Sequence, residues 1–116
     1  MSYFDKFDKK EKLIPRTIEI DCAFYELLEK LSNEKYDASI NKLVNACIEM
    51  LIKNEKVENY DRRNTIRITR TFLLRNSLVE GLNELKNKYG IPIYLLVNIS
   101  IRNALIEEKM LKNNLK

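Results

Sequence analysis

The stretch Thr65-Ile66-Arg67-Ile68-Thr69 alternates polar and apolar residues. A period of two is typical of a β-strand with one buried face and one exposed face. The pattern predicts that Ile66 and Ile68 point inward, whereas Arg67 and the neighbouring threonines point outward. An exposed strand face that carries arginine and threonine is suited to contacts with phosphates and base edges.

Basic residues concentrate in the second half of the chain. Residues 59–116 contain eleven Lys or Arg and five Asp or Glu, whereas residues 1–58 contain ten and twelve. The window 62–79 contains five arginines and no acidic residue. A basic half favours a polyanionic partner, either nucleic acid or an anionic membrane.

Several classes of protein find no support in the sequence. Histidine is absent, and Cys22 and Cys47 lack the spacing of metal ligands, so we expect two buried thiols. The chain has no glycine-rich phosphate loop and no carboxylate cluster with metal spacing. We therefore predict a protein that is not an enzyme and uses no cofactor or metal. No apolar run is long enough to span a bilayer, and no signal-peptide pattern begins the chain, so we expect no membrane partner and a cytoplasmic, intracellular location.

The chain repeats an order of strand, helix, turn and helix. Thr17-Ile18-Glu19-Ile20-Asp21 matches the opening stretch at an offset of 48, and residues 36–45 match residues 89–98 at an offset of 53. Strands are predicted at about 16–21 and 64–69, first helices at about 23–35 and 71–88, and second helices from Ile40 and from Pro92. The corresponding domains are an N-terminal flexible arm at 1–15, a first repeat at 16–53, a linker at 54–62, a second repeat at 63–110 and a tail at 111–116.

Helix ends and apolar faces support these boundaries. Ser39 is an expected N-cap, and Gly90 is an expected left-handed residue after a helix. The predicted helical faces that turn toward the core contain Phe24, Leu28 and Leu31, then Ile40, Leu43, Val44, Cys47, Ile48 and Leu51, then Leu74, Leu78, Leu82, Leu85 and Tyr89, and finally Ile93, Leu96, Val97, Ile101, Ala104 and Leu105. A second apolar line of Leu95, Ile99 and Ile106 either fills the core or supports self-association. Asn45 and Asn98 recur at matching positions, either exposed or fixing the register of the helices.

Neither repeat is large enough to bury a core by itself, and a single strand leaves its backbone groups unpaired. We therefore predict that the two strands pair antiparallel. The predicted fold is mainly α with a two-stranded antiparallel β-ribbon, in which two strand–helix–helix repeats pair into one unit. Ile18, Ile20, Ile66 and Ile68 would cover a four-helix core.

These two strands, together with the helix openings Ser39–Val44 and Pro92–Val97, resemble the ribbon-helix-helix superfamily, which includes the Arc and methionine repressors. The resemblance covers about residues 16–53 and 63–107. Members of that family are normally homodimers in which each chain gives one strand to a ribbon that enters the major groove of DNA, and the N-terminus of the second helix anchors a phosphate. The resemblance therefore implies a tandem, single-chain pseudo-dimer.

The resemblance also implies which residues contact DNA. Base-reading residues would be Thr17, Glu19 and Asp21 on the first strand and Thr65, Arg67 and Thr69 on the second. Phosphate contacts would come from Arg62 and Arg63 and from the helix openings at Ser39, Ile40 and Asn41 and at Ile93 and Tyr94. Glu19 would lie opposite Arg67, where it either accepts from cytosine or pairs with Arg67 across the ribbon. The acidic first strand predicts asymmetric recognition in which the second half dominates.

The expected function is sequence-specific binding of double-stranded DNA. The protein would be a transcriptional regulator such as a repressor, or a plasmid or mobile-element maintenance or transfer accessory protein, with two or more chains associating on the DNA. The alternative is a protein-interaction module that keeps the ribbon-helix-helix scaffold without specific DNA binding. The acidic first strand favours the alternative, and the acid-free arginine window favours DNA.

Overall fold

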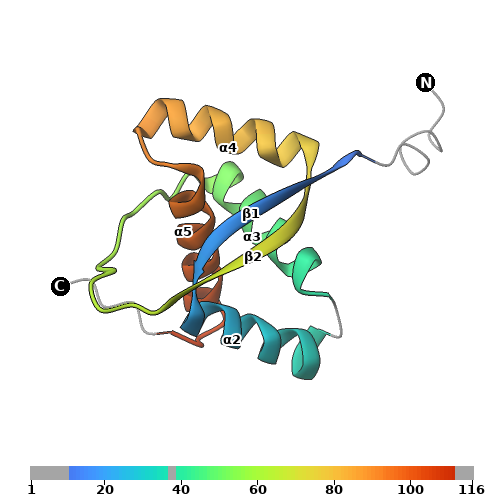
Figure 1. The fold of residues 1–116 in the computed structure, drawn as a ribbon, viewed down its shortest axis with the longest axis vertical. Helices are drawn as coiled ribbons and strands as arrows, with labels where there is room; N and C mark the ends of the chain where they lie inside the picture. The colour runs from blue at the N-terminus through green and yellow to red at the C-terminus, as the bar shows by residue number, and fades with distance from the viewer. Residues whose placement is uncertain (1–10, 37–38, 112–116) are drawn as a thin grey trace.

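The computed structural model describes residues 11–36 and 39–111, and these form one ribbon of two strands packed on helices (Figure 1). The elements follow in the order β1 (Leu13–Asp21), α2 (Cys22–Leu31), a π-helix η1 (Ser32–Tyr36), α3 (Ile40–Asn54), β2 (Arg67–Arg75), α4 (Asn76–Tyr89) and α5 (Ile93–Glu107). The ribbon crosses in front of the helices in Figure 1, with α4 on one side and α2 on the other. The predicted mainly helical fold with a two-stranded antiparallel sheet is confirmed.

The chain ends differ in part from the predicted boundaries. β1 begins at Leu13, so the first strand starts three residues before the expected position 16. Residues 1–10 of the predicted arm and residues 112–116 of the predicted tail lie outside the described part of the chain. The linker between α3 and β2 covers residues 55–66 and contains no helix or strand.

The second strand lies further along the chain than the alternating pattern predicts. β2 spans Arg67–Arg75, whereas the pattern placed it at about 64–69. Ile66 precedes the strand and is 76% exposed, so its expected place in the core is wrong. Phe72 and Leu74 supply the inner face instead, at 2% and 0% exposure. β1 ends at Asp21 and β2 ends at Arg75. Equivalent positions of the two strands are therefore 54 residues apart, rather than the 48 residues that separate the matching stretches of sequence.

The first helix of the second half is shorter than predicted, because residues 71–75 belong to the strand. α4 begins at Asn76, and Leu74 therefore reaches the core from β2. Phe72-Leu73-Leu74 is a short apolar run that fits either a strand or the first turn of a helix. Pairing with the nine residues of β1 decides the matter, because every residue of β2 has a partner on β1.

The predicted helix signals are confirmed elsewhere. The Ser39 hydroxyl accepts a hydrogen bond from the Lys42 N–H at 3.2 Å, as an N-cap does. Gly90 has φ of +69° after α4, where a residue with a Cβ would be strained. Pro92 immediately precedes α5, and its carbonyl accepts from the Leu95 and Leu96 N–H groups.

α5 lies at the centre of the core. Seven consecutive residues, Leu95 to Ile101, are buried, which requires neighbours on every side of the helix. Leu95 and Ile99 of the second apolar line are 6% and 0% exposed, so these two side chains fill the core, and Ile106 is half-buried. Cys47 is also buried, and burial raises the pKa of its thiol to about 12.

Candidate nucleic-acid interface

The outer face of the ribbon is the face that does not contact the helices. Its exposed side chains alternate along both strands, as the pleat of a strand requires. The outer face consists of Leu13, Pro15, Thr17 and Glu19 on β1 and Arg67, Thr69, Thr71 and Leu73 on β2. Thr17, Glu19, Arg67 and Thr69 therefore lie where the sequence predicted. Thr71 and Leu73 were missed because the second strand was predicted to end at about 69, and Leu13 and Pro15 were missed because the first strand was predicted to begin at about 16.

Two threonines occupy the middle of the outer face. Thr17 lies opposite Thr71, and their hydroxyl groups are 2.8 Å apart. Arg16 and Arg70 are the neighbours of this pair, one residue before each threonine. The Arg70 guanidinium is exposed and lies 5.1 Å from the centre of the Tyr25 ring, which holds this cation beside the ribbon.

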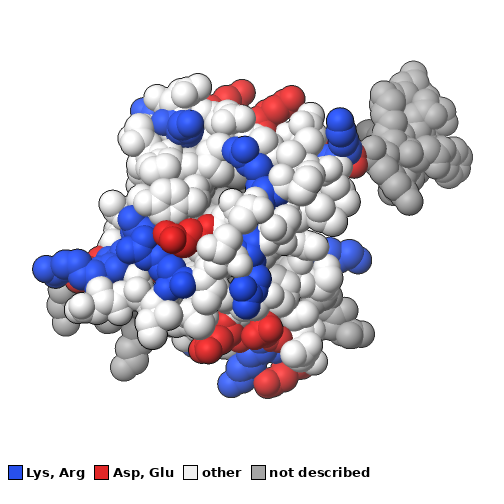
Figure 2. Space-filling view, in the orientation of Figure 1, with Lys and Arg blue, Asp and Glu red and all other residues white. Residues whose placement is uncertain are grey.

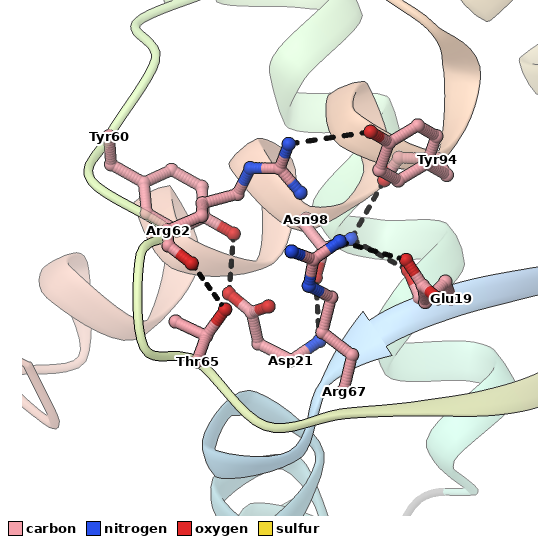
Figure 3. A network of polar contacts seen from close by, with 8 residues as sticks. All are labelled: Glu19, Asp21, Tyr60, Arg62, Thr65, Arg67, Tyr94 and Asn98. Carbon is pink, nitrogen blue, oxygen red and sulfur yellow. Dashed lines mark hydrogen bonds and ion pairs between the residues drawn. The ribbon is translucent and has the colours of Figure 1, made fainter.

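One end of the outer face carries an ion pair, and we call it the charged end. The Arg67 guanidinium donates to the Glu19 carboxylate at 3.0 Å, as Figure 3 shows. The pairing of Glu19 with Arg67 across the ribbon, one of the two predicted alternatives, is present, but the register differs by two residues. Glu19 lies opposite Thr69 and Arg67 lies opposite Asp21, so the ion pair is diagonal.

Asp21 is buried at the charged end and does not reach the outer face. It is 3% exposed and accepts a hydrogen bond from the Tyr60 hydroxyl at 2.6 Å. Its other carboxylate oxygen is buried without a partner among the described residues. The expectation that Asp21 points outward from the ribbon is therefore wrong, because the end of β1 turns this side chain under the linker (Figure 3).

Tyr60 attaches the linker to the body of the protein. Its ring packs 5.6 Å from the Phe24 ring, and the Arg102 guanidinium lies 5.3 Å from the centre of the Tyr60 ring. Burial, followed by the hydrogen bond to Asp21, raises the pKa of Tyr60 well above its usual value. The phenol therefore stays protonated and continues to donate to Asp21 at physiological pH.

Thr65 lies in the linker rather than on the ribbon. Its hydroxyl donates to the Arg62 carbonyl at 2.7 Å, and the side chain is half-buried. Its expected place on the outer face of the second strand is therefore wrong. The alternating pattern begins at Thr65, but β2 begins two residues later, at Arg67. Because two is an even number, Arg67 and Thr69 still face outward, whereas Thr65 is no longer part of the strand.

The two linker arginines differ in their surroundings. Arg62 is half-buried, donates to the Tyr94 hydroxyl at 3.3 Å and lies 5.4 Å from the centre of the Tyr94 ring. Arg63 is paired with Asp61 through two hydrogen bonds of 3.0 and 2.9 Å. These bonds lower the pKa of Asp61 to about 2. Arg62 therefore lies at the N-terminus of α5, whereas Arg63 is neutralised by its neighbour.

The opposite end of the outer face carries no charged pair, and we call it the apolar end. Leu13 and Leu73 are 50% and 40% exposed, and Pro15 lies opposite Leu73. Arg75 lies opposite Leu13 but turns to Glu49 on α3, at 3.1 Å. Ser39, Asn41 and Lys42 at the start of α3 line the same shallow groove as the two leucines.

An asparagine from a helix holds the backbone at each end of the ribbon. At the charged end, Asn98 of α5 accepts from the Asp21 N–H at 3.0 Å and donates to the Glu19 carbonyl at 2.9 Å. At the apolar end, Asn45 of α3 accepts from the Arg75 N–H at 2.9 Å and donates to the Leu73 carbonyl at 2.9 Å. Both side chains are buried, so they fix the helices against the ribbon.

Two further contacts match at the two ends. The Cys22 N–H donates to the Ile66 carbonyl at 2.8 Å, and the Asn76 N–H donates to the Lys12 carbonyl at 3.0 Å. Each bond joins the first residue of a helix to the residue before the other strand. At the start of α3, the Leu73 N–H donates to the Asn41 side-chain oxygen at 3.2 Å. Tyr94 takes the corresponding place in α5 and contacts Arg62 instead. Ile40 and Ile93 are half-buried at the two helix openings.

Charges are spread unevenly over the ribbon side of the molecule. Figure 2 shows lysine and arginine at several places along the ribbon, with acidic residues gathered mainly toward the two opposite edges of this view. In the described part of the chain, no group of three or more His, Cys, Asp or Glu could hold a metal ion. No single described helix has the length and apolar character to cross a membrane; α4 and α5 pass that test only as a pair bent by 103°.

Comparison of the chain with protein-family models, with curated proteins and with solved structures found no match in any of the three.

Proposed function

We propose that this chain is a sequence-specific double-stranded DNA-binding protein that inserts its ribbon into the major groove. In this proposal the two halves form a tandem ribbon-helix-helix pair, with one strand and two helices from each half. One observation carries the proposal: an exposed two-stranded ribbon lies between the N-termini of two equivalent helices, α3 and α5. A two-stranded ribbon fits the width of the major groove.

Matched contacts support the pairing of the two halves. Asn45 and Asn98 make the same two backbone bonds, each to a different strand. The bonds of Cys22 and Asn76 match in the same way, since each joins a helix start to the other strand. Thr17 and Thr71 occupy equivalent positions in the two strands and also face each other. These equivalences support a local two-fold axis through this threonine pair.

The outer face offers polar groups for base contact at its centre. The hydroxyl groups of Thr17, Thr69 and Thr71 can donate or accept, and their methyl groups can contact thymine. Arg16 and Arg70 lie on the two sides of the axis and reach the phosphates that border the groove. The first turns of α3 and α5 present backbone N–H groups and a positive helix end to phosphates further along.

This arrangement revises the set of DNA contacts. Thr17, Glu19, Arg67 and Thr69 stay among the proposed base contacts, and Thr71 and Leu73 join them. Phosphate contacts are assigned to Arg62, Arg16 and Arg70 and to the helix openings at Ser39–Asn41 and Ile93–Tyr94. Arg63 is a weaker candidate because Asp61 already neutralises it. The proposed roles are those of a repressor or a plasmid or mobile-element accessory protein, with two or more chains on one site.

The test is selection of bound duplexes from a random pool, followed by affinity measurements at several salt concentrations. Arg16→Ala and Arg70→Ala should each weaken binding to all sequences and lower the slope of log K against log salt by about 1. Lys53→Ala, in the exposed last turn of α3, is the matched loss of one positive charge away from the ribbon and from the first turns of α3 and α5. Failure to recover any motif, with equal slopes for all three variants, would overturn the proposal.

A second function is favoured by one observation. Leu13 and Leu73 expose apolar surface on the outer face, and Glu19 neutralises Arg67. Both features suit a protein-interaction module in which the ribbon binds another protein. Such a module would retain no sequence preference for DNA, and its weak binding would disappear as salt rises.

A further inference from the structure

We infer, on the basis of the proposed DNA binding, that the ribbon recognises a non-palindromic site whose two halves differ in chemistry. The charged end recognises a G·C pair through Arg67 and Glu19. The apolar end recognises thymine methyl groups through Leu13 and Leu73. Asymmetry therefore lies between the two ends of the ribbon rather than between the two halves of the chain, because each end takes side chains from both strands.

The local two-fold axis makes the two ends directly comparable. Because the axis relates Thr17 to Thr71, it also exchanges Leu13 with Arg67 and exchanges Leu73 with Glu19. The ion pair at one end therefore occupies the same positions as the two leucines at the other. The backbone that presents these side chains is held by an equivalent asparagine at each end, so the two ends share this support and differ in the side chains that face outward.

The charged end matches the edge of a G·C pair. Arginine carries five N–H donors, of which Glu19 engages one in the structure at 3.0 Å. The remaining donors can form a fork onto guanine O6 and N7, and the Glu19 carboxylate can accept from the N4 amino group of cytosine. The two side chains already lie side by side on the exposed surface, at 37% and 50% side-chain exposure. Little ordering is needed for both to contact one base pair.

The outward side chains of the apolar end, Leu13, Pro15 and Leu73, offer no donor or acceptor to a base, and Arg75 at this end is paired with Glu49 on α3. Leu13, Leu73 and the neighbouring Pro15 can make favourable contact only with an apolar group in the groove, and the thymine methyl is the one that standard DNA provides. A G·C pair at this position would lose water from its polar edge without gaining a hydrogen bond. The leucines therefore favour thymine both by attraction and by exclusion.

Symmetrised variants test this inference on the whole chain. L13R/L73E gives both ends the charged chemistry, and E19L/R67L gives both ends the apolar chemistry. From a random duplex pool, the wild-type protein should yield an asymmetric motif with a G·C half and a thymine half. L13R/L73E should yield a near-palindrome of the G·C half, and E19L/R67L should lose the G·C half. Circular dichroism identifies a variant that has not folded, and either folded variant is sufficient for the test.

Modified bases test the same contacts on the wild-type protein. Replacing thymine by deoxyuridine in the thymine half removes only the methyl group and should weaken binding by about fourfold for each methyl contacted. Replacing guanine by 7-deazaguanine in the G·C half should weaken binding by about tenfold, because the arginine fork loses one acceptor. The same replacements in flanking base pairs serve as controls and should have no effect.

The outcomes separate this inference from the proposed function. If the wild-type protein yields no motif, the DNA-binding proposal itself is wrong. If it yields a motif that is palindromic, or if both symmetrised variants keep the wild-type motif, DNA binding stands and the division between the two ends is wrong. A thymine half that tolerates deoxyuridine without loss of affinity would also contradict the assignment of the leucines.

Discussion

The charged end and the apolar end of the ribbon have the same backbone arrangement, but they differ in their outward side chains and in the segments that lie beside them. At both ends an asparagine from a 15-residue helix binds two backbone groups of a strand. At the charged end the linker then adds Tyr60 and Arg62 beneath Glu19 and Arg67, whereas at the apolar end the start of α3 lies beside two exposed leucines. The comparison separates what holds the ribbon in place from what the ribbon can bind.

Substitution of the two asparagines should have the largest effect on stability. It also tests whether the two ends of the ribbon are held equally firmly. Asn98→Ala and Asn45→Ala should each lower the free energy of unfolding by about 3 kcal/mol, because each leaves one N–H and one partly buried carbonyl of a strand without a partner. Urea unfolding measures both, with exposed Asn87→Ala on α4 as a control that should change little. If one asparagine proves far less important than the other, the two ends are not equivalently supported.

Tyr60 should distinguish the ends, because only the charged end has a buried carboxylate. Tyr60→Phe removes the donor to Asp21 and should lower the free energy of unfolding by about 1–3 kcal/mol. Tyr89→Phe is the matched control, since its hydroxyl bonds to Glu55 at 2.9 Å on the exposed surface and contributes much less. Equal effects of the two substitutions in urea unfolding would mean that the Tyr60 bond is not special.

Ser39 tests the helix opening beside the apolar end. Ser39→Ala removes the side-chain cap of α3 and should lower the free energy of unfolding by about 1 kcal/mol. Ser39→Thr keeps a hydroxyl at the cap and should restore most of that stability. α5 has no side-chain cap, because Pro92 stands at the equivalent position. A thermal melt in which the alanine and threonine variants coincide would show that the cap bond contributes nothing.

The ion pair at the charged end should have the smallest effect on folding. A double-mutant cycle of Glu19→Ala and Arg67→Ala should give a coupling below about 1 kcal/mol, because exposed pairs are screened by water and salt. On DNA, the two single variants should differ. Arg67→Ala should lose guanine preference, whereas Glu19→Gln should strengthen nonspecific binding by reducing repulsion from phosphates. A coupling of several kcal/mol would instead assign the pair a structural role.

The sequence predicted the frame of the fold better than its register. Ser39, Gly90 and the spacing of Val44, Ile48 and Leu51 are local signals, and all three were interpreted correctly. The position of β2 depends on its pairing with β1, which is distant in the chain, and the matching letters of residues 17–21 and 65–69 pointed to the wrong alignment. The recurrence of Asn45 and Asn98 contained the better signal, but in the sequence alone it was equally compatible with two exposed side chains.

The sequence predicted the outward-facing residues correctly only where the displacement of the strand register did not change which face of the ribbon they occupy. Arg67 and Thr69 stayed on the outer face, because an even displacement preserves the alternation of a strand. Asp21 and Thr65 could not be placed from sequence, since their positions depend on how residues 55–66 fold back and on the contact between Tyr60 and Asp21. Such contacts join residues that are distant in the chain, so they produce no periodic pattern in the sequence from which they could be predicted.

The linker at residues 55–66 determines how formation of the ribbon depends on protein concentration. It joins α3 to β2 in a single polypeptide, so the strand that β1 needs is present at a high effective concentration however dilute the protein is. Assembly of the ribbon is therefore a unimolecular step, and its midpoint of unfolding should not depend on protein concentration. In addition, a single codon change alters only one end of the ribbon, which lets the two ends diverge in a way that two identical chains could not.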